Sequence, residues 1–360
     1  MSREGLKLSV YFGERDRLDG ELLSDALVDR LGAAEILASA LIRGVEGFGI
    51  KHQLRTDRLL TLSEDLPLMV VAVDYAPKLM RLVPEITEMV GGGLVTLERI
   101  ALPGRQLADD MLFGDGSGEA KLTIYCGRGE ERRGRPVVAA ALDALRAAGL
   151  PGATALSGLD GTILGERRRA RFFSANHGVP ALVVSVGPGE RFADVLPRLR
   201  GLSGRHVVTL ERVRVVRHDG SVLADLPALP ARDEQGLGLW QRVMVFCGEQ
   251  ARWEGRPLHS RLIHRLREAG AAGATVLRGA VGYSDAHGLH GDRLLAIRRR
   301  TPVVVTLIDS VDEIQRLWPI VARATASTGL VTSEVVPAFR AVGPAGHRVG
   351  GLRLAGPPRR

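Results

Sequence analysis

The sequence predicts an α+β protein built from three tandem copies of one β-α-β-β-α-β unit. Three observations lead to this prediction: seven sequence landmarks recur in register, each copy opens on an alternating strand, and each copy contains a third strand that is apolar throughout. The copies span residues 7–100, 121–213 and 242–336.

The landmarks show that these segments are repeats of one another. A glycine closes each first strand, and a G-x-x-G pair follows later in each copy, at Gly44 and Gly47, at Gly158 and Gly161, and at Gly279 and Gly282. Self-similarity of this kind indicates a repeated structural unit. The opening strands read KLSVYFGE, KLTIYCGR and RVMVFCGE, and the copies close on GLVTLERI, HVVTLERV and GLVTSEVV.

Each element of the unit has its own pattern. Apolar and polar residues alternate in the first strand, and a helix follows whose apolar stripe includes Leu27, Val28 and Leu31 in copy one. A second strand such as ALIRG leads through a loop of about 17 residues to a strand such as LMVVAV, which is typical of burial on both faces. The second helix contains a proline near its middle, which predicts a bend or a late start. The order is that of ferredoxin-like domains.

A ferredoxin-like unit carries both helices on one face of its sheet, so its other face needs a cover. Another copy of the same sheet is the simplest cover, and three copies can close a ring through head-to-tail contacts. We therefore expect a compact single-chain pseudo-trimer rather than separate domains. Residues 101–120 and 214–241 are expected to be linkers, and residues 337–360 a basic flexible tail.

Composition narrows the class of protein. The sequence has no apolar run of about 18 residues and no secretory leader, and its two cysteines form no disulfide framework, which predicts a cytoplasmic protein. Cys126 and Cys247 stand where copy one has Phe12, so we interpret both as core residues. Because the sequence contains no catalytic motif, we expect a protein that is not an enzyme, and a hydrolase in the clefts is the weakest alternative.

Charge is distributed unevenly among the copies. Copy one holds 11 Lys+Arg against 15 Asp+Glu, a net −4, whereas copies two and three carry +7 and +4. The runs Arg167–Arg171 and Arg298–Arg300 are candidates for an electrostatic partner surface, although a solvated loop explains them as well. His287 and His290, with Asp285 and Asp292, have metal-ligand side chains, but a polar loop is the favoured interpretation and no metal site is predicted. Few aromatic residues make nucleic-acid binding unlikely.

The stretch YFGERDRLDG…LIRGVEGFG…LSEDLPLMVVAVD in copy one resembles the bacterial domain of unknown function 190, a relative of the PII nitrogen-regulatory proteins. This resemblance implies a trimer of ferredoxin-like units that binds adenine nucleotides in clefts between units. It also implies signalling to enzymes or transporters through a loop after the second strand. EGFG at Glu46–Gly49 resembles the base of that loop, and GGGLV at Gly91–Val95 stands where PII proteins have a phosphate-binding turn.

These residues define the candidate site. Glycines let a ligand approach the backbone and can present consecutive N–H groups to an anion, while Phe48 would supply an apolar wall. GGGLV lacks the lysine of PII turns, and copy two has Arg205 and His206 instead, so fewer than three equal sites are expected. The predicted ligand is a small anion, with ATP, ADP or AMP as candidates, and the chain itself is expected to be monomeric. The alternative is a scaffold whose basic loops dock a protein or nucleic acid. The candidate binding residues are Gly44, Gly47, Phe48, Gly49, Gly91, Gly92, Gly93, Gly279 and Gly282.

Overall fold

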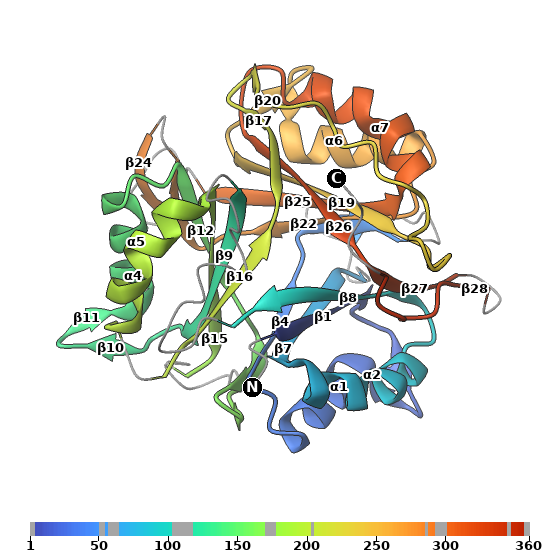
Figure 1. Cartoon of the computed structure of the whole chain (residues 1–360), viewed down its shortest axis with the longest axis horizontal. Helices are drawn as coiled ribbons and strands as arrows, with labels where there is room; N and C mark the ends of the chain where they lie inside the picture. Colours follow the sequence, from blue (N-terminus) through green and yellow to red (C-terminus); the bar gives the residue numbers. More distant parts are fainter. Residues whose placement is uncertain are drawn as a thin grey trace.

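A computed structural model describes residues 4–49, 55–56, 65–102, 118–169, 178–202, 205–284, 287–291, 301–343 and 347–355, with the backbone alone at 55–56 and 287–291. Within these ranges the chain is an α+β protein with six helices and large antiparallel sheets. Figure 1 shows three helix pairs on the outside of the molecule, with the strands of the three repeats converging toward its centre.

Each repeat contributes four main strands and two helices in the predicted order. The four strands lie in the spatial order second, third, first, fourth, and neighbouring strands are antiparallel. In repeat one, for example, Leu8 lies between Ala72 on the third strand and Leu97 on the fourth. The elements of repeat one are β1 (Glu4–Gly13), α1 (Leu23–Ala33), β4 (Ala38–Arg43), β7 (Pro67–Tyr75), α2 (Ala76–Met89) and β8 (Gly93–Ala101).

The other two repeats follow the same plan. Short hairpins precede the first helix of each repeat: β2 (Arg17–Leu18) with β3 (Glu21–Leu22), β10 (Glu131–Arg132) with β11 (Arg135–Pro136), and β20 (Arg252–Trp253) with β21 (Arg256–Pro257). Repeat two has β9 (Glu119–Gly127), α4 (Val137–Ala147), β12 (Gly152–Ser157), β15 (Pro180–Pro188), α5 (Gly189–Arg200) and β16 (Val207–Arg212). Repeat three has β19 (Trp240–Gly248), α6 (Leu258–Glu268), β22 (Ala274–Arg278), β25 (Pro302–Ser310), α7 (Val311–Ala324) and β26 (Leu330–Val336).

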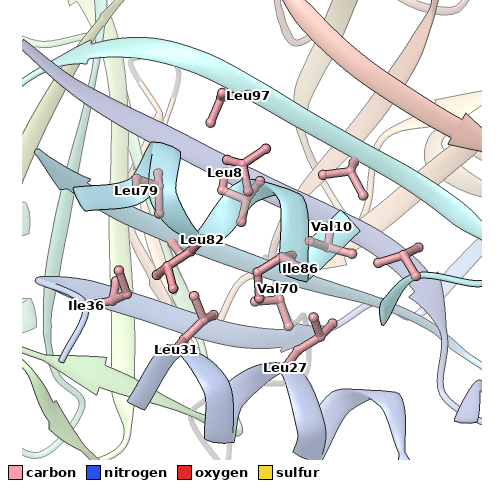
Figure 2. Close-up of a cluster of buried hydrophobic side chains, with 14 of the residues drawn as sticks. Leu8, Val10, Leu27, Leu31, Ile36, Val70, Leu79, Leu82, Ile86 and Leu97 are labelled. Atoms are coloured by element: carbon pink, nitrogen blue, oxygen red, sulfur yellow. The ribbon is translucent and has the colours of Figure 1, made fainter. Parts of the chain in front are cut away.

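The helices bury their apolar stripes against one face of each sheet. In repeat one, Leu27 and Leu31 of α1 and Leu79 and Ile86 of α2 pack over Leu8 of β1, all of them essentially inaccessible to water (Figure 2). Equivalent clusters lie under α4 and α5 and under α6 and α7. Burial of this stripe, rather than helix propensity alone, fixes the helices in place.

The proline of each second helix lies inside the helix. Pro84, Pro197 and Pro319 each stand well past the helix start, and every second helix begins directly after its third strand. The expectation of a late start is therefore wrong. Proline removes one main-chain hydrogen bond from a helix interior, and burial of the helix face offsets that cost.

The opposite faces of the three sheets pack on one another. One buried cluster combines Ala40 and Val71 of repeat one, Tyr125 and Leu182 of repeat two and Val304 of repeat three. The sheet face opposite the helices, which an isolated repeat would expose to water, is therefore covered by the other two repeats.

The repeats are also joined by strands that leave one repeat and extend the sheet of another. The strand that contains the second glycine of each G-x-x-G pair makes these connections. β5 (Glu46–Phe48) of repeat one pairs with β22 of repeat three, β13 (Asp160–Ile163) of repeat two pairs with β4 of repeat one, and β23 (Val281–Ser284) of repeat three pairs with β12 of repeat two. The three exchanges close a circle. Each exchanged strand then returns as a hairpin, through β6 (Arg55–Thr56), β14 (Glu166–Arg167) and β24 (His287–Gly291).

The segments expected to be linkers and tail contain further strands. β17 (Arg214–His218), which forms a hairpin with β18 (Ser221–Val222), pairs with the fourth strand of repeat three. β27 (Ala338–Val342) pairs with the fourth strand of repeat one and with β28 (Arg348–Val349). Leu352 and Ala355 are buried as well, so residues 337–355 are not a flexible tail in the part that the structure describes. The physical reason is that the fourth strands of repeats one and three each have an edge that requires a pairing partner.

Among the described residues, no helix combines the length and the hydropathy that a bilayer crossing requires.

Candidate functional site

The G-x-x-G pairs lie at the seams where strands pass from one repeat to the next. Val45 donates its N–H to Val276 O, and the equivalent Leu159 and Ala280 donate to the neighbouring repeats at Leu41 and Ala155. At these crossings two backbones approach so closely that a side chain has no room.

The packing explains four of the predicted site glycines. A Cβ on Gly47 would lie 2.7 Å from Ala274 O, and one on Gly282 would lie 2.4 Å from Ala153 O. A Cβ on Gly44 or on Gly279 would lie 2.7 Å from the Cγ of the proline that begins the third strand. These four glycines are therefore required by the seams, whether or not a ligand binds there.

A cleft between repeats one and three brings the remaining candidates together. Phe48 and Gly49, at the end of β5, line the same cavity as Gly92 and Gly93, at the start of β8. The cavity measures about 110 Å³ and is completed by Ala274 and neighbouring residues of β22 from repeat three. We call it the first cleft. Of the other candidates, Gly44, Gly91 and Gly279 do not line it, and Gly47 lies directly beside it in β5.

Four aromatic residues line the first cleft, but the rings of two of them pack elsewhere. Phe12 belongs to the core under the helices of repeat one, and Phe48 to the core under the helices of repeat three. Tyr11 of β1 and Trp240 of β19 provide the aromatic surface of the cleft, and the Trp240 ring stacks on Phe339 at 4.0 Å between centroids. Burial raises the pKa of Tyr11, with smaller opposing effects from nearby charges, so its hydroxyl stays protonated. The walls therefore suit a planar ring.

The charged groups at the first cleft are few. Among the described residues, its lining includes one acidic residue, Asp16, and neither lysine nor arginine. Asp16 accepts a hydrogen bond of 2.8 Å from the Gly13 N–H, which orders the turn after β1. An anion in this cleft would find backbone N–H groups, but no cationic side chain among the lining residues.

The glycine turn before β8 has two different parts. Gly93 has φ +126°, and a Cβ there would lie 2.2 Å from Tyr11 O, so this glycine is required by packing. Gly91 and Gly92, like Gly49, have nothing within 4 Å of an added Cβ. The space beside these three glycines is open, so a ligand can approach their backbone without steric hindrance.

A second cleft lies at the equivalent place between repeats three and two. It measures about 130 Å³ and is lined by Gly282 and Tyr283 of β23, by Phe246 and Cys247 of β19, and by Thr154 of β12. Its rim differs from that of the first cleft. His218 and Asp219 stand where the first cleft has Ala341 and Val342.

At the junction between repeats two and one, side-chain hydrogen bonds join the two repeats. Thr162 of β13 bonds the Ser39 hydroxyl at 2.9 Å and donates to Ile36 O at 3.0 Å. Beside it, the buried Asp160 accepts hydrogen bonds from Arg167. Burial raises the pKa of Asp160 to about 6, against the N–H of Gly161 and the charge of Arg169, which lower it.

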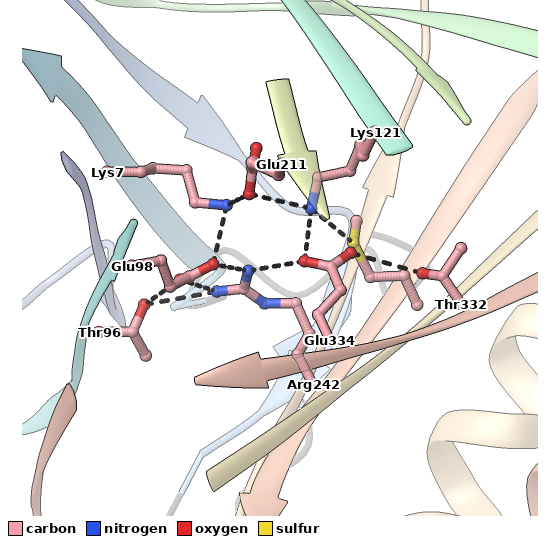
Figure 3. Close-up of polar contacts among 9 residues, drawn as sticks. Lys7, Thr96, Glu98, Lys121, Glu211, Arg242, Thr332 and Glu334 are labelled. Atoms are coloured by element: carbon pink, nitrogen blue, oxygen red, sulfur yellow. Dashed lines mark hydrogen bonds and ion pairs between the residues drawn. The ribbon is translucent and has the colours of Figure 1, made fainter. Parts of the chain in front are cut away.

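Six buried charged residues form a ring at the centre of the molecule (Figure 3). Each repeat supplies a cation from its first strand and a glutamate from its fourth. Around the ring the charges alternate in the order Lys7, Glu98, Arg242, Glu334, Lys121 and Glu211, and the last glutamate returns to the first lysine.

The geometry of the ring is that of charge-assisted hydrogen bonds. Arg242 contacts both oxygens of Glu98, at 2.5 and 2.6 Å, and the Lys7 Nζ lies 2.9 Å from Glu98 Oε2. Lys121 Nζ lies 2.5 Å from Glu334 Oε2. Parallel contacts of this kind are the stronger class of ion pair.

Burial and neighbouring charges shift the pKa values of the residues in this ion-pair ring. Burial by itself would raise the pKa of Glu98, but Arg242 and Lys7 hold that pKa well below its usual range. Burial would lower the pKa of Lys7, but Glu211 and Glu98 hold it well above its ordinary value. The three glutamates approach within 4.8 Å of one another, a spacing that a metal ion could bridge. Because three cations already balance them, the cluster acts as an ion-pair ring that joins the repeats.

The sequence reasoning did not single out the ring. A signal was available, because the first-strand motif of each copy opens on Lys or Arg and each last strand carries Glu at the same position. Charged residues at core-facing positions of three repeats are informative, since burying a charge is costly unless it is paired.

The basic run of repeat two lies against the acidic repeat. Arg167 pairs with Asp29 and Asp160, and Arg169 pairs with Asp25 at 3.0 Å. The charge imbalance between copies one and two is therefore partly neutralised inside the chain. Arg171 and the run Arg298–Arg300 lie outside the described residues, as do Asp285 and Asp292.

Cys126 is buried in the core, whereas Cys247 is half-buried and lines the second cleft. Burial raises the pKa of both thiols to about 12, so neither is a thiolate near neutral pH. His287 and His290 belong to β24, for which the structure describes the backbone alone.

Solved structures with a related arrangement are remote. Aspartate kinase from Synechocystis aligns with 94% of this chain at 12% identity and a TM-score of 0.26. The chain spans 45% of that kinase. An anthrone oxidase-like protein aligns with 66% of this chain and 94% of its own length, at 13% identity and a TM-score of 0.19. Neither likeness is strong enough to support an argument.

Sequence comparisons are more informative. A UPF0166 protein of Aquifex aeolicus (strain VF5) is 34% identical over 92 residues, which are 26% of this chain and 86% of that protein. UPF0166 protein MJ1524 of Methanocaldococcus jannaschii is 26% identical over 91 residues, 25% of this chain and 83% of that protein. Both relatives are thus about as long as one repeat.

The family model DUF190, described as "Uncharacterized ACR, COG1993", matches residues 5–102, 119–215 and 240–338. These ranges coincide with the three repeats and cover most of the sequence. The chain therefore belongs to the DUF190 family and carries three copies of its domain.

Proposed function

We propose that the chain is a PII-like ligand-binding protein in which three ferredoxin-like domains form a pseudo-trimer within one chain. The strand order of each repeat supports this proposal, as does the circle of exchanged strands between repeats. The single-repeat length of the relatives supports it too, because three such units are needed to close the ring.

The observation that carries the functional proposal is the composition of the first cleft. The loop base at Phe48 and Gly49 and the glycine turn at Gly92 and Gly93 line one cavity, which strand β22 of another repeat completes. A small molecule there contacts two repeats at once. It also touches the residues that directly precede the loop after the second strand, so binding would bias that loop.

The candidate ligand is a small anion with an aromatic ring, and adenine nucleotides are the class to test first. The aromatic walls fit the ring, and the open backbone at Gly91 and Gly92 fits the phosphates. At about 110 Å³ the cavity is smaller than the roughly 300 Å³ of a typical drug-sized pocket. The aromatic ring of the ligand would therefore enter the cavity, and its phosphates would lie at the opening of the cavity.

Affinity for this ligand is expected to be modest. Among the described residues no cationic side chain lines the first cleft, so from this lining the phosphates would gain backbone hydrogen bonds alone. A dissociation constant of about 1 μM corresponds to roughly −8 kcal/mol. Adenosine should bind within about tenfold of AMP, because a tenfold difference corresponds to about 1.4 kcal/mol and the ring would supply most of the contacts.

Thermal unfolding with ATP, ADP, AMP, cyclic AMP and adenosine tests the proposal. Ligand at a hundredfold excess over its dissociation constant stabilises a fold by about 2.7 kcal/mol, which raises the melting temperature by a few degrees. Gly92→Val should abolish the shift and leave the free protein folded, since nothing lies within 4 Å of the added Cβ.

Gly351→Val is the matched control, because Gly351 has equally open surroundings but lies outside the first cleft. An unmoved melting curve with every compound at millimolar concentration would refute the nucleotide proposal. Hydrolysis products in the same samples would instead identify an enzyme.

The alternative of a scaffold that docks partners through basic loops has less support. Arg167 and Arg169, which suggested it, are paired with aspartates of repeat one.

A further inference from the structure

The first and second clefts differ at one pair of equivalent rim positions. In the first, β27 runs beside β8 and places Val342 opposite Gly93. In the second, β17 runs beside β26, with His218 opposite Leu330, and Asp219 follows at the turn beside Gly329. A valine at one rim is thus replaced by a carboxylate at the other.

The Asp219 carboxylate is held in place by the protein. Its Oδ1 accepts a hydrogen bond of 2.9 Å from the Gly329 N–H, and its backbone N–H donates to Gly329 O at 2.8 Å. Its Oδ2 lies 3.8 Å from His218 Nε2, and the side chain is 42% exposed. One carboxylate oxygen therefore fixes the side chain, while the group remains accessible from the cleft that it lines.

Among the described residues, Asp219 is the one acidic residue that lines the second cleft, and no lysine or arginine lines it. Cys247 adds no charge, because burial raises its pKa to about 12. His218 is the one histidine among the described residues that line this cleft.

The body of the second cleft is apolar and aromatic. Phe246 lines it together with Val184 and Val186, and the cavity measures about 130 Å³. Tyr283 also borders the cleft, but it belongs to the core under the helices of repeat two. An aromatic wall beside a fixed carboxylate is the arrangement that attracts an ammonium group on an apolar body.

We propose that the second cleft is a separate binding site for a small organic cation, with Asp219 as its counter-charge. At the equivalent rim position the first cleft has Val342, which carries no charge, and its own carboxylate, Asp16, lies at the turn after β1. The inference is independent of the nucleotide proposal, since it concerns other residues and a ligand of opposite charge.

Three small molecules that share a phenyl ring and differ in charge test the inference. The probes are 2-phenylethylammonium, phenylacetamide and phenylacetate, titrated into the full chain and followed by ligand-observed nuclear magnetic resonance. We expect the cation to bind about fivefold more tightly than the amide, the size of a partly exposed charge interaction of roughly 1 kcal/mol, and the anion to bind least. Equal binding of the three probes would overturn the inference.

Asp219→Asn locates the effect. Asp219 has φ 45°, a conformation that asparagine tolerates, and an amide oxygen can still accept from Gly329. The variant should lose the preference for the cation and keep its affinity for the amide. Asp225→Asn removes the same charge from an exposed position outside the cleft and should keep the preference. If Asp219→Asn retains the full preference, the site is elsewhere and the inference fails.

Discussion

The central ring of charges makes a strong prediction about stability. Glu98→Gln preserves the shape of the side chain and removes one negative charge from a cluster of three cations and three carboxylates. Arg242 and Lys7 then remain buried without their shared partner. Breaking a buried ion pair on one side typically costs about 3–5 kcal/mol.

The expected change in melting temperature follows from the size of the chain. At roughly 2.1 cal/mol/K per residue, unfolding 360 residues carries an entropy of about 0.76 kcal/mol/K. A loss of about 3–5 kcal/mol should therefore lower the melting temperature by about 4–7 °C. Differential scanning calorimetry gives both quantities.

A double-mutant cycle separates pairing from packing. Combining Glu98→Gln with Arg242→Gln restores a balance of charge, so the double variant should cost less than the sum of the single variants by about 2 kcal/mol. Glu85→Gln, which removes a pair with Arg30 on the surface, is the control and should leave the melting temperature unchanged. A change below about 1 °C for Glu98→Gln, or strictly additive costs, would refute the reasoning.

The remaining predictions concern pH and the seams. The pKa of Glu98 is depressed in the folded state, so its contribution is complete above its unfolded pKa of about 4.3 and is lost as pH falls further. The difference in unfolding free energy between the wild type and Glu98→Gln should thus shrink below about pH 4, and a difference that is constant down to pH 2 would contradict this. The pKa of Asp160 is raised to about 6, so the wild type should gain stability relative to Asp160→Asn as pH falls from 7 to 5, measured as melting temperatures, and a parallel pH profile would count against it. Gly282→Ala should destabilise the protein by about 1–3 kcal/mol in urea titrations, because its Cβ would lie 2.4 Å from Ala153 O, whereas Gly49→Ala should be neutral, and equal effects would show that the seam is not tightly packed.

The repeat architecture could be predicted because its signals are local and occur three times. Alternation in the first strands, the stripe at Leu27 and Leu31, and the apolar third strands all recur in register, so each copy supports the interpretation of the others. The need to cover the second face of each sheet also follows from the apolar third strand, and the cluster around Val71 and Leu182 fills that role.

The exchanged strands could not be predicted, because nothing in a single copy tells which sheet a strand joins. The motifs at Gly47 and Gly282 could be interpreted as turns or as ligand loops, and the close approach of another backbone appears only when the repeats are assembled. The strand β27 was missed for a related reason. Its sequence is short and follows a proline, and its pairing partner, β8, lies more than 200 residues earlier.

The candidate site could be predicted in part. The expected circular arrangement of the repeats placed two pairs of residues at one cleft, Phe48 with Gly49 and Gly92 with Gly93. In the structure all four line one cavity. The aromatic contribution of Trp240 and the charge difference at Asp219 come from segments outside the motifs, and sequence spacing gives no information about them.

The measurement that tests the account most directly is small-angle scattering combined with light scattering, because the clefts exist only if one chain closes the ring by itself. We predict a monomer of 38.7 kDa with a radius of gyration of about 21 Å. A chain that is elongated as a monomer, or that associates into an obligate trimer, would contradict the closed ring and the clefts that depend on it.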